Sequence, residues 1–190
     1  MPRTATLYSD FNCPFCYAFG ERLIALRLVD VVAWRGVQHA PHLPIPMAAA
    51  GPTFASELAR EVGLVQRLAP EVPIVLPKGK PNTGPAILAV AAAMQQDGGK
   101  AYAFAASLYR AFWQRGIDIS DRSVIEDLAR RADLADLTMN ESVRRVVEEW
   151  HDDWIGRGVG SVPDLVRDDG EAMTGLVDAE VIERFLSSPS

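Results

Sequence analysis

The sequence predicts an α/β fold in which two β-containing halves are separated by a block of helices. A strand–helix–strand pattern occupies residues 4–37, a strand–strand–helix pattern closes residues 161–186, and the intervening part is mainly helical in its spacing of apolar residues. Alternating apolar residues indicate strands, and apolar residues three or four apart indicate helices. We therefore predict a β-α-β … β-β-α core at residues 1–40 and 156–190, with a helical domain and its connecting loops inserted at residues 41–155.

The first half begins with a loosely alternating strand at residues 4–11, which ends in a turn at Ser-Asp-Phe-Asn. Pro14 then falls near the first position of a helix, where its missing N–H costs nothing. Residues 31–37 are mostly apolar and predict a second, buried strand. A strand–helix–strand crossover of this kind implies parallel strands with a right-handed connection.

The middle of the chain begins with a loop, because prolines interrupt residues 38–52. Helices are predicted at residues 54–68, 86–96, 100–115, 121–132 and 138–155, with Ser120 and Thr138 in N-cap positions for the last two. Residues 161–167 and 171–174 then predict two short strands around an Asp-Asp-Gly turn, followed by a helix at 179–186.

Composition limits the classes of partner. The formal net charge of -6 argues against nucleic acid and gives no attraction to an anionic membrane. No apolar run approaches the roughly 18 residues that span a bilayer. The N-terminus has no apolar signal region, so we expect a cytoplasmic protein, as a monomer or a homodimer.

The only two cysteines form the motif Cys13-Pro14-Phe15-Cys16 at the predicted start of the first helix. The unpaired N–H groups and the dipole at a helix N-terminus favour an anion. Cys-x-x-Cys spacing typically lowers the pKa of the attacking thiol. We therefore predict that Cys13 is an exposed nucleophile and that Cys16 is a shielded resolving thiol. Phe15, beside Pro14, would present an apolar surface to the substrate.

Other interpretations of the cysteine pair remain open. A zinc site would need two more ligands, which His39 and His42 could in principle supply from the proline-rich loop. The pair could also be a permanent structural disulfide or two inert thiols. We predict no metal and no required cofactor.

Several segments resemble the DsbA-like thioredoxin superfamily, especially its cytosolic FrnE-type branch. Residues 10–17, Asp-Phe-Asn-Cys-Pro-Phe-Cys-Tyr, resemble its active-site segment. Pro81-Asn82-Thr83, residues 108–132 and Gly160-Ser161-Val162-Pro163 are similar to later segments, in the same order. The resemblance covers residues 4–186, is weakest at 40–76, and implies a thioredoxin-like core.

The resemblance also implies roles for individual residues. The Val162–Pro163 bond would be cis and face the dithiol, and the backbone of Val162 would pair with a substrate chain. Asn82 would contact substrate or glutathione, although alone it predicts only a turn. Asp164 stands where the family usually has Thr, and a carboxylate near the nucleophile would raise its pKa unless it points away. Asp10 could relay the proton of Cys16 or simply end the strand.

Three functions follow. The first is a thiol–disulfide oxidoreductase acting on disulfide-containing proteins or small thiols. The second is a glutathione-dependent isomerase or transferase, because 2-hydroxychromene-2-carboxylate isomerases and kappa-class glutathione transferases are similar, although they carry Ser in place of the first Cys. The third is a metal-binding or interaction module. Glutathione is a possible co-substrate.

Overall fold

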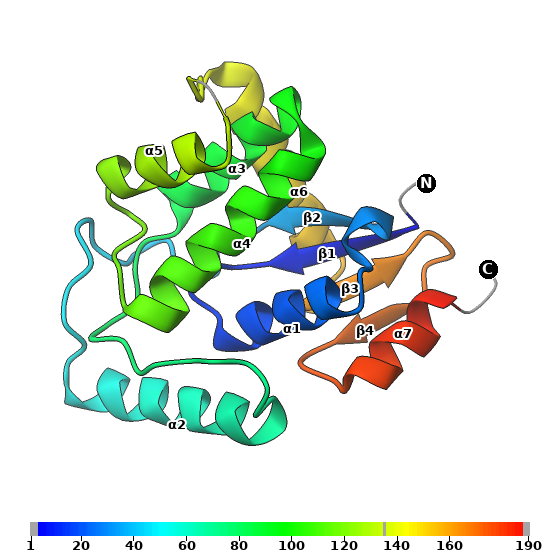
Figure 1. The fold of residues 1–190 in the computed structure, drawn as a ribbon, viewed down its shortest axis with the longest axis horizontal. Coiled ribbons are helices and arrows are strands. Elements are labelled where there is room, and N and C mark those ends of the chain that lie inside the picture. The colour runs from blue at the N-terminus through cyan, green and yellow to red at the C-terminus, as the bar shows by residue number, and fades with distance from the viewer. Residues whose placement is uncertain (1–3, 135, 188–190) are drawn as a thin grey trace.

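The computed structural model describes residues 4–134 and 136–187, which form a four-stranded mixed sheet with helices on both faces (Figure 1). In chain order the elements are β1 (Ala5–Ser9), α1 (Pro14–Ala25), a 3-10 turn (Val29–Val31), β2 (Val32–Gly36), α2 (Pro52–Leu68), α3 (Gly84–Gln96), α4 (Gly98–Arg115), α5 (Arg122–Arg131), α6 (Glu141–Gly156), β3 (Asp164–Arg167), β4 (Ala172–Thr174) and α7 (Ala179–Ser187).

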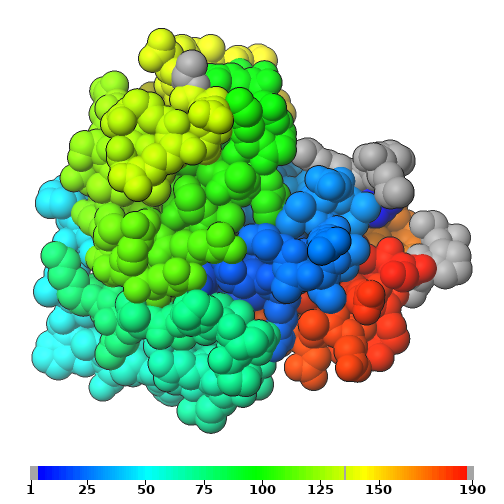
Figure 2. Space-filling view, viewed as in Figure 1, coloured from blue at the N-terminus to red at the C-terminus, as the bar shows by residue number. Residues whose placement is uncertain are grey.

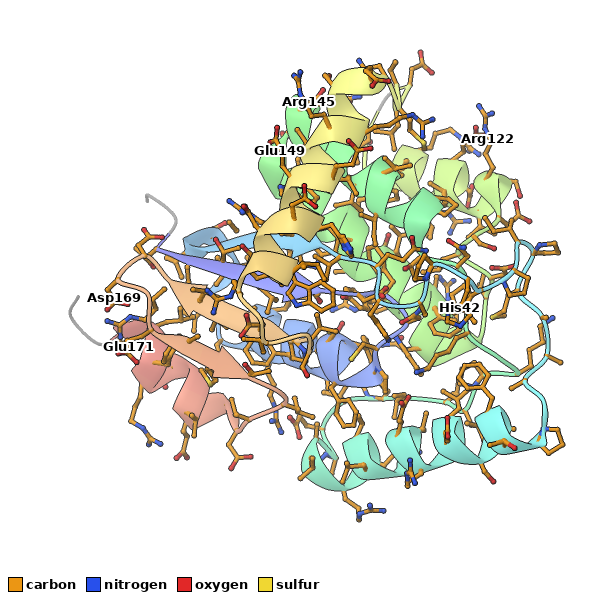
Figure 3. The ribbon with its side chains drawn as sticks, turned by 180° about the vertical axis from the view of Figure 1, so that it is seen from behind. His42, Arg122, Arg145, Glu149, Asp169 and Glu171 are labelled. Carbon is orange, nitrogen blue, oxygen red and sulfur yellow. The ribbon has the colours of Figure 1, made fainter. Side chains whose placement is uncertain are left out.

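The strands lie in the order β2-β1-β3-β4, with β1 parallel to β2 and both other pairs antiparallel. The predicted β-α-β … β-β-α order and the parallel first pair are therefore confirmed. α1 and α7 cover the face that is in front in Figure 1, and α6 crosses the opposite face, which is in front in Figure 3. None of the described helices is long and apolar enough to cross a bilayer.

One cluster of buried side chains runs from the sheet to the helices between β2 and β3, and includes Leu7, Phe11, and Phe104 and Trp113 on α4. The division into a core at 1–40 and 156–190 and an insertion at 41–155 stays a prediction. Residues 1–3 and 188–190 of that core lie outside the described residues.

Two helices begin later than predicted. α5 is capped by Asp121, whose carboxylate accepts a hydrogen bond from the backbone N–H of residue 123, while Ser120 donates its hydroxyl proton to Asp118. α6 is capped by Asn140 rather than Thr138. Asp and Asn are as favourable at the N-cap position as Ser, and more favourable than Thr. The sequence before each of these helices contains more than one such residue, so it does not decide which one is the N-cap.

Candidate active site

The N-terminus of α1 is built around the Cys13 sulfur. Cys13 is the N-cap residue, Pro14 occupies the first turn, and the Cys13 Sγ accepts a hydrogen bond from the backbone N–H of Cys16 at 3.4 Å. The first turn of α1 carries no acidic side chain. Both cysteines are free thiols. Cys13 therefore lies at the helix N-terminus, a position that favours a negative charge on its sulfur.

The two thiols differ in exposure and in ease of ionisation. Cys13 is 6% exposed and Cys16 is completely buried, so the predicted exposed nucleophile is largely covered but still the more accessible of the two. Burial opposes ionisation of Cys13, but hydrogen bonds from Cys16 and the charge of His39 outweigh it, and the pKa of Cys13 is lowered. Burial, reinforced by the neighbouring Cys13, raises the pKa of Cys16 well above its usual value.

The loop before β3 lies against the nucleophile. The Val162–Pro163 bond is cis, and the Cys13 Sγ lies 3.7 Å from the carbonyl oxygen of Val162. The loop is held on either side, because Gly175 N–H donates to the carbonyl of Pro163 and Trp154 Nε1 donates to that of Ser161. Val162 and Phe15 are half-buried. The structure thus brings the dithiol together with Pro14, Phe15, Val162 and Pro163.

Asp10, completely buried, joins three segments at the end of β1. Its Oδ1 accepts a hydrogen bond from Thr83 Oγ1 at 2.7 Å and a longer one from the backbone of Asn12. Its Oδ2 accepts from His39, through the backbone N–H at 3.0 Å and Nδ1 at 2.7 Å. Its predicted part in moving the proton of Cys16 stays a prediction.

His39 is a residue whose position the sequence analysis missed, because it was considered only as a metal ligand. Burial alone would lower its pKa, but the hydrogen bond and charge of Asp10 raise it, which favours the cation. The parallel register places Ser9 opposite Gly36, so the residues that follow the two strands meet at one edge of the sheet. The parallel pairing predicted for these two strands was the signal available in the sequence. Among the described residues, no group of three or more His, Cys, Asp or Glu side chains could hold a metal ion.

Two predicted residues have their polar atoms engaged elsewhere. Asn82 accepts hydrogen bonds from Gln38 and Gly84 and donates to two backbone carbonyls of the loop after β2, so it ties that loop to α3. Asp164 is buried and pairs with Arg157 Nε at 2.9 Å and Thr174 Oγ1 at 2.8 Å. Substrate contact by Asn82 stays a prediction. The expected rise in the pKa of the nucleophile beside Asp164 is not observed, because that pKa is lowered and the carboxylate opposing it is Asp10.

Residues 9–11, shortly before the Cys-Pro-Phe-Cys motif, each form a hydrogen bond with α4 or with the N-cap residue of α3. The hydroxyl oxygens of Ser9 and Tyr109 are 2.5 Å apart and share a hydrogen bond. Asp10 Oδ1 accepts a hydrogen bond from Thr83 Oγ1 at 2.7 Å, and the carbonyl of Phe11 accepts one from Trp113 Nε1 at 2.8 Å. These residues were not among the predicted site residues, apart from Asp10. α4 and the start of α3 therefore hold the segment that leads into the dithiol.

Comparison with known proteins agrees with this geometry. The family described as the DSBA-like thioredoxin domain matches residues 4–187. A candidate protein disulfide isomerase from Nitrosomonas europaea has a TM-score of 0.78 at 17% identity, covering 98% of this chain and 96% of its own. The cytosolic disulfide reductase DsbM from Pseudomonas aeruginosa, solved with GSH, has a TM-score of 0.67 at 20% identity, covering 98% and 93%.

A 2-hydroxychromene-2-carboxylate isomerase has the same fold, with a TM-score of 0.69 at 18% identity, covering 96% of this chain and 93% of its own. A search of curated proteins finds no match. At these identities the solved structures establish the fold and leave the reaction open.

Proposed function

Because the chain belongs to the DsbA-like thioredoxin domain family, we propose that it is a thiol–disulfide oxidoreductase, with Cys13 as the attacking thiolate and Cys16 as the resolving thiol. One observation carries the proposal: the Cys13 sulfur lies at a helix N-terminus, 3.7 Å from the Val162 carbonyl of a cis-proline loop. The opposite pKa shifts of the two thiols support the division of roles, since a thiolate is the nucleophile in disulfide exchange.

The reaction has two exchange steps. The Cys13 thiolate attacks one sulfur of a substrate disulfide, that S–S bond breaks, and the other substrate sulfur leaves as a thiolate. Cys16 then loses its proton and attacks the Cys13 sulfur, which forms the Cys13–Cys16 disulfide and releases the second substrate sulfur. Two electrons pass from the dithiol to the substrate, and an external thiol must reduce the protein again. The same steps in reverse would oxidise a substrate dithiol.

The surroundings of the nucleophile favour a disulfide-containing protein or small thiol as partner. Phe15 and Val162 offer partly exposed apolar surface beside the sulfur, and the loop backbone could pair with an extended substrate chain. Glutathione is proposed as a possible co-substrate, supported by the similar fold of a reductase solved with GSH. That relative is cytosolic, which supports a cytoplasmic location for this chain.

The test compares Cys13→Ser with Cys16→Ser. Reduction of a protein disulfide should be abolished in Cys13→Ser, whereas Cys16→Ser should still react once and accumulate a mixed disulfide detectable by mass. Equilibration of the wild-type protein in glutathione buffers would give the reduction potential of the pair. Full reductase activity in Cys13→Ser would refute the assignment.

A second candidate is a glutathione-dependent isomerase of the 2-hydroxychromene-2-carboxylate isomerase type, supported by the shared fold. It requires saturable glutathione binding that does not depend on disulfide formation. Calorimetric titration of glutathione into Cys16→Ser, under reducing conditions, would reveal it. The absence of binding heat at millimolar glutathione would eliminate this candidate and leave the oxidoreductase.

A further inference from the structure

A pair of buried hydroxyl groups lies beside the resolving cysteine. Ser9, the last residue of β1, is 1% exposed, and Tyr109 on α4 is 5% exposed. Their oxygen atoms are 2.5 Å apart. Both residues line a cavity of about 20 Å³ together with Cys16. α1 and α4 are neighbours on the face shown in Figures 1 and 2, and most of the residues that line the cavity come from these two helices and β1.

We propose that Ser9 and Tyr109 are positioning residues for the second exchange step, in which Tyr109 donates a hydrogen bond to Ser9 and Ser9 donates one to the Cys16 thiolate as it forms. This inference rests on the proposed oxidoreductase function. It concerns only the resolving step, because neither residue touches the substrate.

The Cys16 thiolate needs hydrogen-bond donors because Cys16 is completely buried. A thiolate enclosed in apolar surroundings is costly unless hydrogen-bond donors face it. Burial raises the pKa of Cys16, and a hydrogen bond from the Ser9 side chain, followed by one from the backbone of Asp10, acts in the opposite direction. Tyr109 is a suitable last donor in this series of hydrogen bonds. Burial raises its pKa well above the usual value, so its hydroxyl keeps its proton and can donate it to a hydrogen bond.

The hydroxyl groups of Ser9 and Tyr109 can form hydrogen bonds with both the thiol and the thiolate of Cys16. While Cys16 is a thiol, its proton can point to Ser9, whose own proton points to Tyr109. When the thiol proton leaves, both hydroxyls can rotate so that each donates toward the sulfur, because a hydroxyl is both donor and acceptor. The other titratable groups near this sulfur are Cys13, Asp10, Tyr17, Tyr102 and Glu21, the last paired with Arg110.

The proposed step is balanced. Cys16 releases its proton to solvent, the resulting thiolate attacks Cys13 Sγ, the Cys13–Cys16 bond forms, and the bond from Cys13 to the substrate sulfur breaks. The electron pair of that broken bond leaves with the substrate sulfur. No additional oxidant or reductant is involved in this step.

The test uses dithiobis(nitrobenzoate) as substrate, because each step of the reaction releases one coloured thionitrobenzoate. Stopped-flow traces of the reduced protein separate attack by Cys13, the first release, from resolution by Cys16, the second. We expect Tyr109→Phe to slow the second release about tenfold near neutral pH, as loss of a hydrogen bond in a chain to an ionised group would. The first release should keep its rate.

The matched control is Tyr102→Phe, which removes a hydroxyl from the same helix and the lining of the same cavity. It should leave both releases unchanged. Ser9→Thr, which keeps the hydroxyl, should resolve faster than Ser9→Ala. In Tyr109→Phe the pH midpoint of the second release should move to higher pH, an effect that a loss of fold stability alone would not produce.

The outcomes separate this inference from the proposed function. If Tyr109→Phe matches Tyr102→Phe in the second release at every pH, the positioning role is wrong while the oxidoreductase stands. If the wild-type protein shows no first release that depends on Cys13, the oxidoreductase itself is refuted, and the positioning role with it.

Discussion

Replacing His39 by Gln should raise the pKa of the Cys13 thiol and slow its alkylation. His39 Nδ1 lies 2.7 Å from Oδ2 of Asp10, which is completely buried. The substitution removes a cation that favours the thiolate. It also leaves Asp10, whose charge disfavours the thiolate, without its ion-pair partner. Both effects raise the pKa of Cys13.

The expected size follows from the exposure of the histidine. A nearby charge typically shifts a pKa by about 1–3 units. The side chain of His39 is 36% exposed, so solvent screens its charge and we expect the low end, about one unit. One unit corresponds to about 1.4 kcal/mol, or about a tenfold smaller thiolate fraction where the thiol is mostly protonated.

The pH dependence has a definite sign. The pKa of His39 is raised, so its positive charge is fully present below the usual histidine pKa and is lost as the pH rises through the raised value. The difference between wild type and His39→Gln should therefore be largest at acidic pH. It should vanish at alkaline pH, where the histidine is neutral and the thiolate forms in both proteins.

The measurement is the rate of iodoacetamide alkylation against pH, made in the Cys16→Ser background so that one thiol reacts. His42→Gln is the matched control, because His42, labelled in Figure 3, is an exposed residue of the same loop. The backbone N–H of residue 39 still donates to Asp10 in the variant, which helps to keep the loop in place. Identical profiles for the two variants would refute the electrostatic role of His39.

Three further substitutions test two polar residues considered for the site and one close contact between the loops before α2 and α3. Asp164→Asn should lower the free energy of unfolding by about 2 kcal/mol, because it weakens a hydrogen bond between charged groups. It should leave the alkylation profile of the nucleophile unchanged, and a lowered alkylation midpoint would show that this carboxylate does act on the thiol. Gly79→Ala should lower the free energy of unfolding by about 1–3 kcal/mol, measured by thermal unfolding, because the added Cβ would lie 2.1 Å from the carbonyl oxygen of Ala48. The control is Gly20→Ala, whose added Cβ meets nothing within 4 Å and should not lower the stability. Asn82→Ala should lower the melting temperature and leave KM for a small disulfide unchanged, and a raised KM at unchanged melting temperature would instead support its predicted contact with substrate.

Local patterns were enough to predict the order of elements, because periodicity reports which residues are buried on each strand and helix. Helix starts were less certain, since neighbouring polar residues such as Ser120 and Asp121 can both cap. The position of the cis-proline loop came from family resemblance, and the sequence spacing of 149 residues between Cys13 and Val162 gives no local signal for it. Long-range hydrogen bonds depend on how the helices pack, which no short pattern encodes.

The contacts of residues 9–11 illustrate why the electrostatics of the dithiol had to come from the structure. Their partners lie 100, 73 and 102 residues away in sequence, on α4 or at the start of α3. The sequence drew attention to Asp164, one residue after the cis-proline, but that carboxylate forms an ion pair with Arg157. The carboxylate that opposes the thiolate is Asp10, and His39 offsets its charge. Ionisation of the dithiol therefore depends on the start of α3 and the loop after β2, which hold the Asp10–His39 ion pair in place. The local Cys-Pro-Phe-Cys sequence determines only part of the pKa of Cys13.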